Sequence, residues 1–207
     1  MNFALPCLYP ITDTRLSGLS HAEQARRMIA GGAKFIQLRE KHASPEEFYR
    51  EAQEAIEIAH SNEVKIIIND RTDIALALKA DGVHLGQDDL PPAEARKLLG
   101  NKAIIGFSTH NIDQVRSALD LPVDYIAFGP VFTTKTKENP DPVVGLELLS
   151  LIKKDLRGFP LVAIGGINES NFRETLAAGA DSVAVISAIL REPDLITERV
   201  KFFSSNS

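Results

Sequence analysis

The residues best suited to chemistry are cations, carboxylates and hydroxyls that directly follow short apolar segments. In the segment Gln37–Lys41, the side chains of Gln37, Arg39 and Lys41 occupy alternate positions. In an extended strand these three share one face, whereas Leu38 lies on the other. A face that carries both an arginine and a lysine predicts a site for an anion.

Carboxylates follow two further apolar segments, at Asn69–Arg71 and His84–Asp89. Carboxylates that lie close together need a cation, and Mg²⁺ prefers a few carboxylate oxygens with water and substrate phosphates as its other ligands. Asp70 and Asp89 are therefore candidate Mg²⁺ ligands, and Asp88 is a weaker one. The alternative is that each of the two caps the helix that follows it.

Hydroxyls and an imidazole follow another apolar segment, at Gly106–His110. Ser108 is a candidate for substrate binding. His110 has two interpretations, because a lone histidine beside the helix-capping Asn111 can be a packing neighbour or an acid–base group.

The longest predicted connection runs from Gly129 to Gly145 and is rich in hydroxyls and amines. Long ordered loops on compact proteins are usually functional, so this one is a candidate phosphate-binding lid; the alternative is a solvated loop. Its candidate ligand-binding residues are Thr134, Lys135, Thr136 and Lys137.

Glycine and serine mark a second candidate anion site. Gly165-Gly166 and Ile186-Ser187 each end an apolar segment just before a predicted helix. Glycines let backbone N–H groups approach an anion, and a helix N-terminus adds a favourable dipole. Two separate anion sites imply two phosphorylated ligands.

A repeated junction predicts the elements that position these residues. An alanine-rich helix end runs into a β-branched strand four times, at 30–38, 77–85, 118–128 and 177–186. Equivalent positions at Lys34, Asp81, Asp124 and Asp181 are separated by 47, 43 and 57 residues, which fits two strand–helix units each time. The intervening strands are expected at 8–12, 65–69, 103–107 and 161–165.

Eight strands that alternate with helices form either a doubly wound sheet or a barrel. The strand count and the length of 207 residues favour one (β/α)8 TIM barrel, an α/β fold that spans residues 1–207 as a single domain. Helix starts support the alternation: Ser44 and Glu47 form a predicted capping box, and Asn111 with Gln114 is similar. In this fold the loops after the strands build the active site.

Composition narrows the functional class. The chain is 44% hydrophobic and 25% charged, with a formal net charge of −5, which argues against a general nucleic-acid binder. The first ten residues resemble no signal peptide, and 18 consecutive apolar residues occur nowhere. With Cys7 as the single cysteine, we expect a cytoplasmic protein without a membrane partner.

The motifs together resemble one family, thiamine phosphate synthase, also called thiamine-phosphate pyrophosphorylase. Seven blocks carry the resemblance nearly end to end and in order: 9–13, 37–41, 68–71 with 82–87, 106–110, 128–132, 134–137 and 163–168. The family resemblance implies a transferase that joins hydroxymethylpyrimidine diphosphate to a thiazole phosphate, with release of diphosphate.

The resemblance also implies roles for particular residues. Pyrimidine diphosphate would contact Gln37, Leu38, Arg39, Glu40, Lys41, Asn69, Ser108 and Lys137. Thiazole phosphate would contact Thr134, Lys135, Thr136, Gly166, Ile186 and Ser187. Arg39, Lys41, Ser108 and Lys137 would be the catalytic set, and Asp70 and Asp89 would hold Mg²⁺ through the Leu-Gly-Gln-x-Asp spacing.

Two other functions are compatible with the barrel and its phosphate site. A thiazole tautomerase would use an acid–base residue such as His110 and would not require a metal. A regulatory protein would bind thiazole phosphate without turnover. Asp70, Asp89 and Lys137 argue against the tautomerase, whereas the regulatory protein stays an alternative. The sequence is also compatible with a homo-oligomer.

Overall fold

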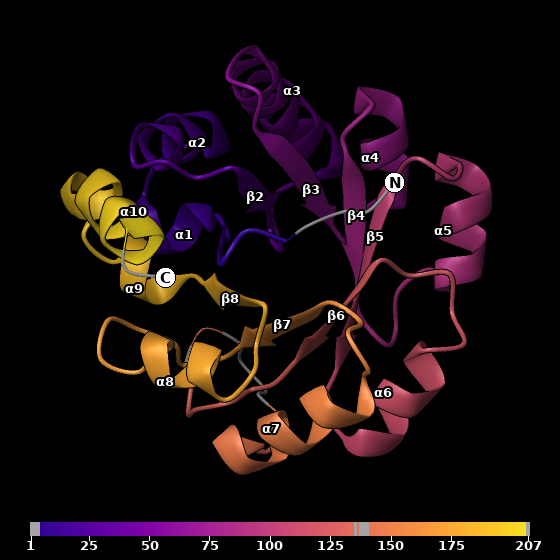
Figure 1. Ribbon diagram of the computed structural model, residues 1–207. Coiled ribbons are helices and arrows are strands. Elements are labelled where there is room, and N and C mark those ends of the chain that lie inside the picture. The colour runs from indigo at the N-terminus through magenta and orange to yellow at the C-terminus, as the bar shows by residue number, and fades with distance from the viewer. Residues whose placement is uncertain (1–4, 135, 137–140, 206–207) are drawn as a thin grey trace.

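The computed structural model describes residues 5–134, 136 and 141–205. In this part of the chain eight parallel strands alternate with helices, which surround them as a ring in Figure 1. The strands are β1 (Leu8–Pro10), β2 (Phe35–Leu38), β3 (Lys65–Asn69), β4 (Gly82–Leu85), β5 (Ile104–Thr109), β6 (Tyr125–Phe128), β7 (Leu161–Ile164) and β8 (Ser182–Val185). The helices are α1 (Thr14–Ser17), α2 (His21–Ala30), α3 (Pro45–Ser61), α4 (Thr72–Leu78), α5 (Pro92–Leu99), α6 (Ile112–Ala118), α7 (Gly145–Asp155), α8 (Phe172–Ala177), α9 (Ser187–Leu190), the 3-10 helix η1 (Pro193–Leu195) and α10 (Ile196–Ser205).

The sheet closes on itself. Its strand order is β1-β8-β7-β6-β5-β4-β3-β2, and every hydrogen-bonded neighbour is parallel. At the seam between β1 and β2, Ile11 forms a parallel bridge with Gln37, and the Thr12 amide donates to the Gln37 carbonyl at 2.9 Å. The predicted (β/α)8 barrel is therefore confirmed, and the doubly wound alternative is wrong.

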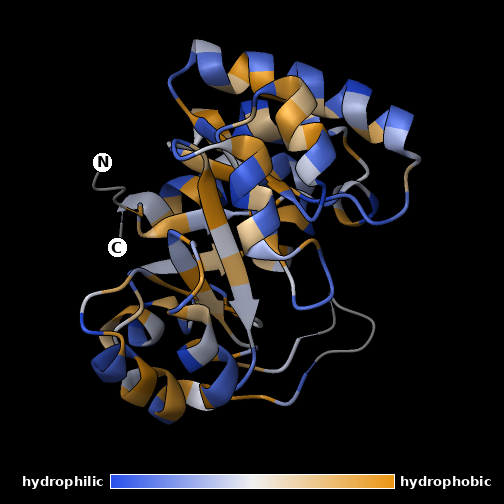
Figure 2. Cartoon of the chain, turned by 90° about the vertical axis from the view of Figure 1, so that its right-hand side faces the viewer, coloured by the Kyte–Doolittle hydropathy of each residue, from blue (hydrophilic) through white to orange (hydrophobic). Residues whose placement is uncertain are grey.

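Alternation along the strands divides the core into two layers. Side chains such as Phe35 and Tyr125 pack inside the barrel, while their neighbours Ile36 and Ile126 pack against the helices. The helices show hydrophilic and hydrophobic colours side by side in Figure 2, as expected where one helix face covers the strands. Parity along each strand therefore decides which side chains enter the barrel.

The repeated aspartate at the strand entrances has a structural cause. Asp81, Asp124 and Asp181 each accept a hydrogen bond at 2.8 Å from a backbone amide at the start of the neighbouring strand. Basic partners lie beside them; Arg96 Nη2, for example, is 2.6 Å from Asp124 Oδ2. The repeat thus ties adjacent strands together at the end opposite the predicted site.

Helix capping agrees with the sequence analysis. The capping box is present at α3, where Ser44 Oγ accepts from the Glu47 amide at 3.2 Å and Glu47 Oε2 accepts from the Ser44 amide at 3.1 Å. Asn111 caps α6 by accepting from the Gln114 amide at 2.9 Å. Among the described residues, no helix combines the length and the apolar character that a membrane span requires.

Candidate active site

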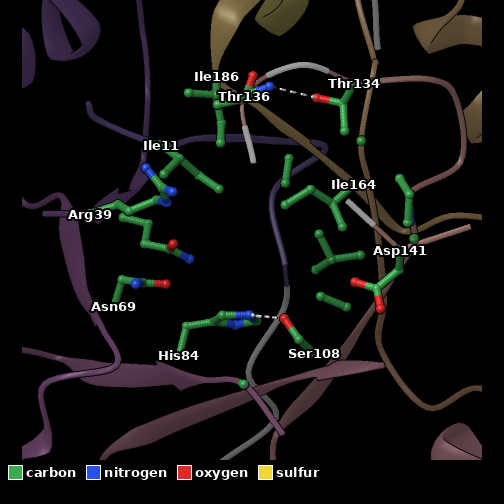
Figure 3. A pocket seen from close by; sticks show the side chains of 18 of the residues that line it. Ile11, Arg39, Asn69, His84, Ser108, Thr134, Thr136, Asp141, Ile164 and Ile186 are labelled. Atoms are coloured by element: carbon green, nitrogen blue, oxygen red, sulfur yellow. Dashed lines mark hydrogen bonds between the residues drawn. The ribbon is translucent and has the colours of Figure 1, made fainter. Parts of the chain in front are cut away.

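A cavity of about 500 Å³ opens at the carboxyl ends of the strands, and side chains from many of the strand-end loops line it (Figure 3). Arg39 and Asn69 lie on one side of the view, and Thr134 and Asp141 lie on the other. Residues of both predicted anion sites therefore line one cavity.

A chain of buried hydrogen bonds forms the floor of this cavity. Gln37 Nε2 donates to the Tyr9 hydroxyl at 2.8 Å, and the hydroxyls of Tyr9 and Tyr125 lie 2.9 Å apart. The Tyr125 hydroxyl is 3.0 Å from His84 Nδ1, and His84 Nε2 is 2.8 Å from Ser108 Oγ. The chain fixes the amide of Gln37 and the hydroxyl of Ser108 at its two ends.

Burial keeps this chain neutral. It lowers the pKa of His84 to about 4 and raises the pKa values of Tyr9 and Tyr125. A neutral imidazole has one donor and one acceptor nitrogen. One ring nitrogen of His84 therefore donates a hydrogen bond to its neighbour in the chain, and the other accepts one. None of these three residues has a role predicted from the sequence. The strand alternation that places Gln37 inside the barrel nevertheless also places His84 inside, between Val83 and Leu85.

Two cations line one side of the cavity, and each has an acidic partner. Arg39 Nη1 lies 2.7 Å from Asp13 Oδ2, and both side chains are largely shielded from solvent. Lys41 Nζ contacts the carboxylate of Asp70. An anion that binds beside Lys41 therefore meets an ammonium group already held next to the predicted metal ligand.

The two predicted metal ligands lie beside each other. Burial raises the pKa of Asp89, hydrogen bonding from the Gly86 amide at 2.6 Å opposes this shift, and the nearby charge of Asp70 raises the pKa further. Neither aspartate caps the next helix, since α4 and α5 have Arg71 and Pro91 at their N-caps without a capping side-chain hydrogen bond. The capping alternative is thus wrong for both.

The chemistry of this pair fits a hard divalent cation. Two neighbouring carboxylates are stabilised by an added positive charge, and oxygen ligands are those that Mg²⁺ prefers. Asp88 also lines the cavity. In the described part of the chain no group of three or more His, Cys, Asp or Glu residues has metal-binding geometry.

Two residues of the 37–41 motif have side chains outside the cavity. Leu38 is fully buried in the layer between strands and helices, as its parity indicates. Glu40 turns toward the protein, where Thr14 Oγ1 donates to it at 2.7 Å and the His42 amide donates at 2.7 Å. Neither side chain therefore lines the cavity, and a ligand contact by Leu38 or Glu40 stays a prediction.

Glu40 should contribute to stability in a defined pH range. Burial alone would raise its pKa, but hydrogen bonds from Thr14, His42 and Ala43 outweigh this effect and hold the pKa at about 2. A carboxyl whose pKa is lowered in the folded state stabilises the fold above its unfolded pKa, near 4.5, and loses this effect as the pH falls from about 4.5 to about 2.

We therefore expect Glu40→Gln to lower the free energy of unfolding at pH 7 by up to about 3 kcal/mol. The difference from the wild type should shrink as the pH falls below about 4.5, as measured by urea unfolding at several pH values. A difference that stayed constant down to pH 3 would contradict an electrostatic role for Glu40.

The opposite rim carries the second predicted anion site. Gly166 has φ 68°, and a Cβ there would lie 2.6 Å from the Thr133 carbonyl oxygen, so the position favours glycine on both grounds. The predicted residues of this rim that line the cavity are Thr134, Thr136, Gly166, Ile186 and Ser187. Lys135 and Lys137 lie outside the described residues.

His110 belongs to the cavity lining and is held by the backbone. Its Nδ1 lies 2.7 Å from the Gly129 carbonyl oxygen, and its amide donates to Gln114 Oε1 at 2.7 Å. With Nδ1 donating to a carbonyl, Nε2 of a neutral ring is an acceptor. The imidazole thus contacts the backbone at the start of the long loop after β6.

One polar atom in the cavity wall lacks a protein partner. Asn69 Nδ2 is buried and makes no hydrogen bond with any residue that the structure describes. Asn69 lines the cavity, and a buried donor without an acceptor is costly. A ligand acceptor atom, such as a ring nitrogen or a phosphate oxygen, would satisfy it.

Comparisons with known proteins point to one family. The family model described as thiamine monophosphate synthase matches residues 8–189. The thiamine-phosphate synthase of Chloroflexus aurantiacus is 44% identical over 91% of this chain and 87% of its own length, and that of Persephonella marina is 46% identical over 96% of both. A solved thiamine phosphate pyrophosphorylase from Pyrococcus furiosus superposes with a TM-score of 0.86 at 36% identity, covering 96% of this chain and 93% of that one.

Proposed function

The chain belongs to the thiamine monophosphate synthase family and is a transferase, and on that premise we propose that it joins hydroxymethylpyrimidine diphosphate to hydroxyethylthiazole phosphate. The products are thiamine phosphate and diphosphate. The observation that carries this proposal is that two sets of anion-binding groups line a single cavity, so that two phosphorylated substrates can meet there.

The first substrate is assigned to the side of the cavity formed by β2 to β5. Arg39 and Lys41 supply positive charge for its diphosphate, while Gln37, Asn69 and Ser108 offer polar atoms to its ring. The unpartnered Nδ2 of Asn69 supports this assignment, because it requires an acceptor from the ligand. Lys137, outside the described residues, is proposed to join the same diphosphate.

The second substrate is assigned to the opposite rim. Its single phosphate would accept hydrogen bonds from the backbone at Gly166 and Ser187 and from the hydroxyls of Thr134 and Thr136. In this arrangement the thiazole ring faces the pyrimidine across the cavity. Lys135, also outside the described residues, is proposed to bind here.

The proposed reaction is dissociative. The C–O bond to diphosphate breaks first, and the amino-pyrimidine ring delocalises the positive charge left on its methylene carbon. The thiazole nitrogen then attacks that carbon with its lone pair, and the bonding electrons of the broken bond leave with diphosphate. The protein contributes positioning and stabilisation of the leaving group by Arg39 and Lys41.

Asp70 and Asp89 are the residues that would hold Mg²⁺. When bound, the ion supplies further charge stabilisation to the leaving diphosphate. Lys41 contacts Asp70, so its ammonium would share this carboxylate with the ion. Lys41 is thereby held within reach of any phosphate that binds beside Asp70.

The proposal is tested by incubating purified protein with both substrates, with Mg²⁺ and with EDTA in its place. We expect thiamine phosphate and diphosphate to form in equal amounts, and only when the metal is present. A tautomerase would convert the thiazole phosphate alone and without metal. A regulatory protein would bind thiazole phosphate and yield no product.

Controls separate chemistry from folding. Asp70→Ala should abolish product formation while circular dichroism shows an intact barrel. Metal-independent coupling would refute the assignment of Asp70 and Asp89, and the absence of product under all conditions would refute the transferase proposal.

A further inference from the structure

Hydrogen bonds from three consecutive residues directly after β1 reach the loop after β2. Thr12 Oγ1 accepts from the Arg39 amide at 3.2 Å, and Asp13 Oδ2 accepts from Arg39 Nη1 at 2.7 Å. Thr14 Oγ1 donates to Glu40 Oε2 at 2.7 Å. Consecutive residues thus hold both the backbone and the guanidinium of Arg39.

Asp13 is itself fixed in place. Its Oδ1 accepts from the Leu16 amide at 3.0 Å and caps α1, and its own amide donates to Gln24 Oε1 at 3.0 Å. Gln24 is fully buried, and the Asp13 side chain is only 16% exposed. The carboxylate therefore offers Arg39 a fixed partner rather than a mobile one.

Asp13 lies behind Arg39 as seen from the cavity. Arg39 lines the cavity and is labelled in Figure 3, whereas Asp13 is not among the lining residues. Among the residues that the structure describes, Asp13 is the acid paired with this guanidinium, and the pair uses Nη1. A guanidinium has five N–H donors, so Nε and Nη2 remain for a phosphate group.

We propose that Asp13 is a positioning residue that holds the Arg39 guanidinium in the orientation that binds the diphosphate group. The inference rests on the proposed function, which places that diphosphate beside Arg39. Without Asp13, the long arginine side chain would sample several rotamers and would lose that freedom on binding. Asp13 contacts one nitrogen from outside the cavity, so it orients the guanidinium without displacing the ligand.

Asp13→Asn is the informative variant, because asparagine caps helices as well as aspartate but carries no charge. The experiment measures binding of inorganic diphosphate, at a fixed excess of Mg²⁺, by calorimetry. We expect Asp13→Asn to weaken binding about three- to tenfold. In an Arg39→Ala background the same substitution should not weaken diphosphate binding further, because the guanidinium that Asp13 positions is absent.

Asp124→Asn is a matched control. Asp124 also accepts a backbone amide and pairs with an arginine, Arg96, but it lies at the opposite end of the barrel. Its substitution should leave diphosphate affinity unchanged. Asp13→Ser, which keeps a capping oxygen, replaces Asp13→Asn if melting curves show that the asparagine variant is misfolded.

Equal weakening in the Arg39→Ala background would overturn the inference, because Asp13 would then act through the fold. Tighter diphosphate binding in Asp13→Asn would also overturn it, since the carboxylate would be a competitor. If the wild type makes thiamine phosphate and Asp13→Asn binds diphosphate as the wild type does, this inference alone fails. Wild-type protein that neither binds diphosphate nor forms product would overturn the proposed function and the inference together.

Discussion

Replacing Asp89 with asparagine is expected to lower the rate of thiamine phosphate formation by about two orders of magnitude and to stabilise the metal-free protein. The two effects have one origin. Asp89 is half-buried beside Asp70, and both its burial and that neighbouring charge raise its pKa. Asparagine removes the charge and keeps an oxygen that can accept from the Gly86 amide.

The metal-free protein should gain stability because the desolvated charge beside Asp70 is gone. A gain of about 1 kcal/mol raises the melting temperature of a chain of this length by about 2–4 °C. Melting curves in EDTA and in Mg²⁺ test this. The wild type should be stabilised by Mg²⁺ through mass action, and the variant should respond much less.

Asp73→Asn is the control for the Asp89 experiment. Asp73 is an exposed carboxylate on α4 that pairs with Arg71 and does not line the cavity. Its substitution should change neither the rate nor the Mg²⁺-dependent shift in melting temperature. Full activity of Asp89→Asn, or loss of activity together with lower stability in EDTA, would contradict a metal-binding role for Asp89.

The sequence predicts the architecture because the barrel depends on local patterns. Strand alternation and helix capping act over a few residues, as at Ser44 and Glu47, and the structure confirms both. The aspartates at positions 81, 124 and 181 reveal the repeat because each must accept a backbone amide at the same point of its unit. The position of the site at the strand ends follows from the fold class.

Within the site, parity and family resemblance differ in what they predict. Parity places Gln37, Arg39 and Lys41 on one face, and all three line the cavity. The resemblance added Leu38 and Glu40 as neighbours in the motif, but their side chains have partners outside the cavity. Adjacency in a motif therefore indicates a shared strand end and does not indicate a shared face.

The contacts that the sequence could not predict join residues far apart in the chain. Tyr9 and Tyr125 are separated by 116 positions and meet only because β1 and β6 face each other across the barrel. The pairing of Arg39 with Asp13 depends on how two loops leave neighbouring strands. Such contacts depend on strand register and loop path, which residue types alone do not determine.

Gly106 is a position where even an added methyl group should cause a large loss of stability. A Cβ at this position would lie 2.5 Å from Cε2 of Tyr125 and closer still to its Cζ and hydroxyl. The tyrosine ring cannot retreat freely, since it packs edge-on against Tyr9 and Phe35 and stacks on His84. Gly106→Ala is expected to cost about 3 kcal/mol of unfolding free energy.

The same substitution should lower activity, because a displaced Tyr125 breaks the hydrogen bonds that run from Gln37 to Ser108. Gly18→Ala serves as the control: Gly18 has open space around it and φ 70°, so we expect only the backbone penalty of about 1 kcal/mol and full activity. Urea unfolding and initial rates measure the two effects.

A second substitution separates the steric effect from the hydrogen bonds. Tyr125→Leu removes the ring atoms that a methyl group at position 106 would strike, so the Gly106→Ala/Tyr125→Leu variant should be less destabilised than the sum of the two single variants by about 1 kcal/mol or more. Its activity should stay low, since leucine cannot link Tyr9 to His84. Additive losses of stability would show that the alanine methyl group does not meet Tyr125, and recovery of activity would show that the buried chain does not position Ser108.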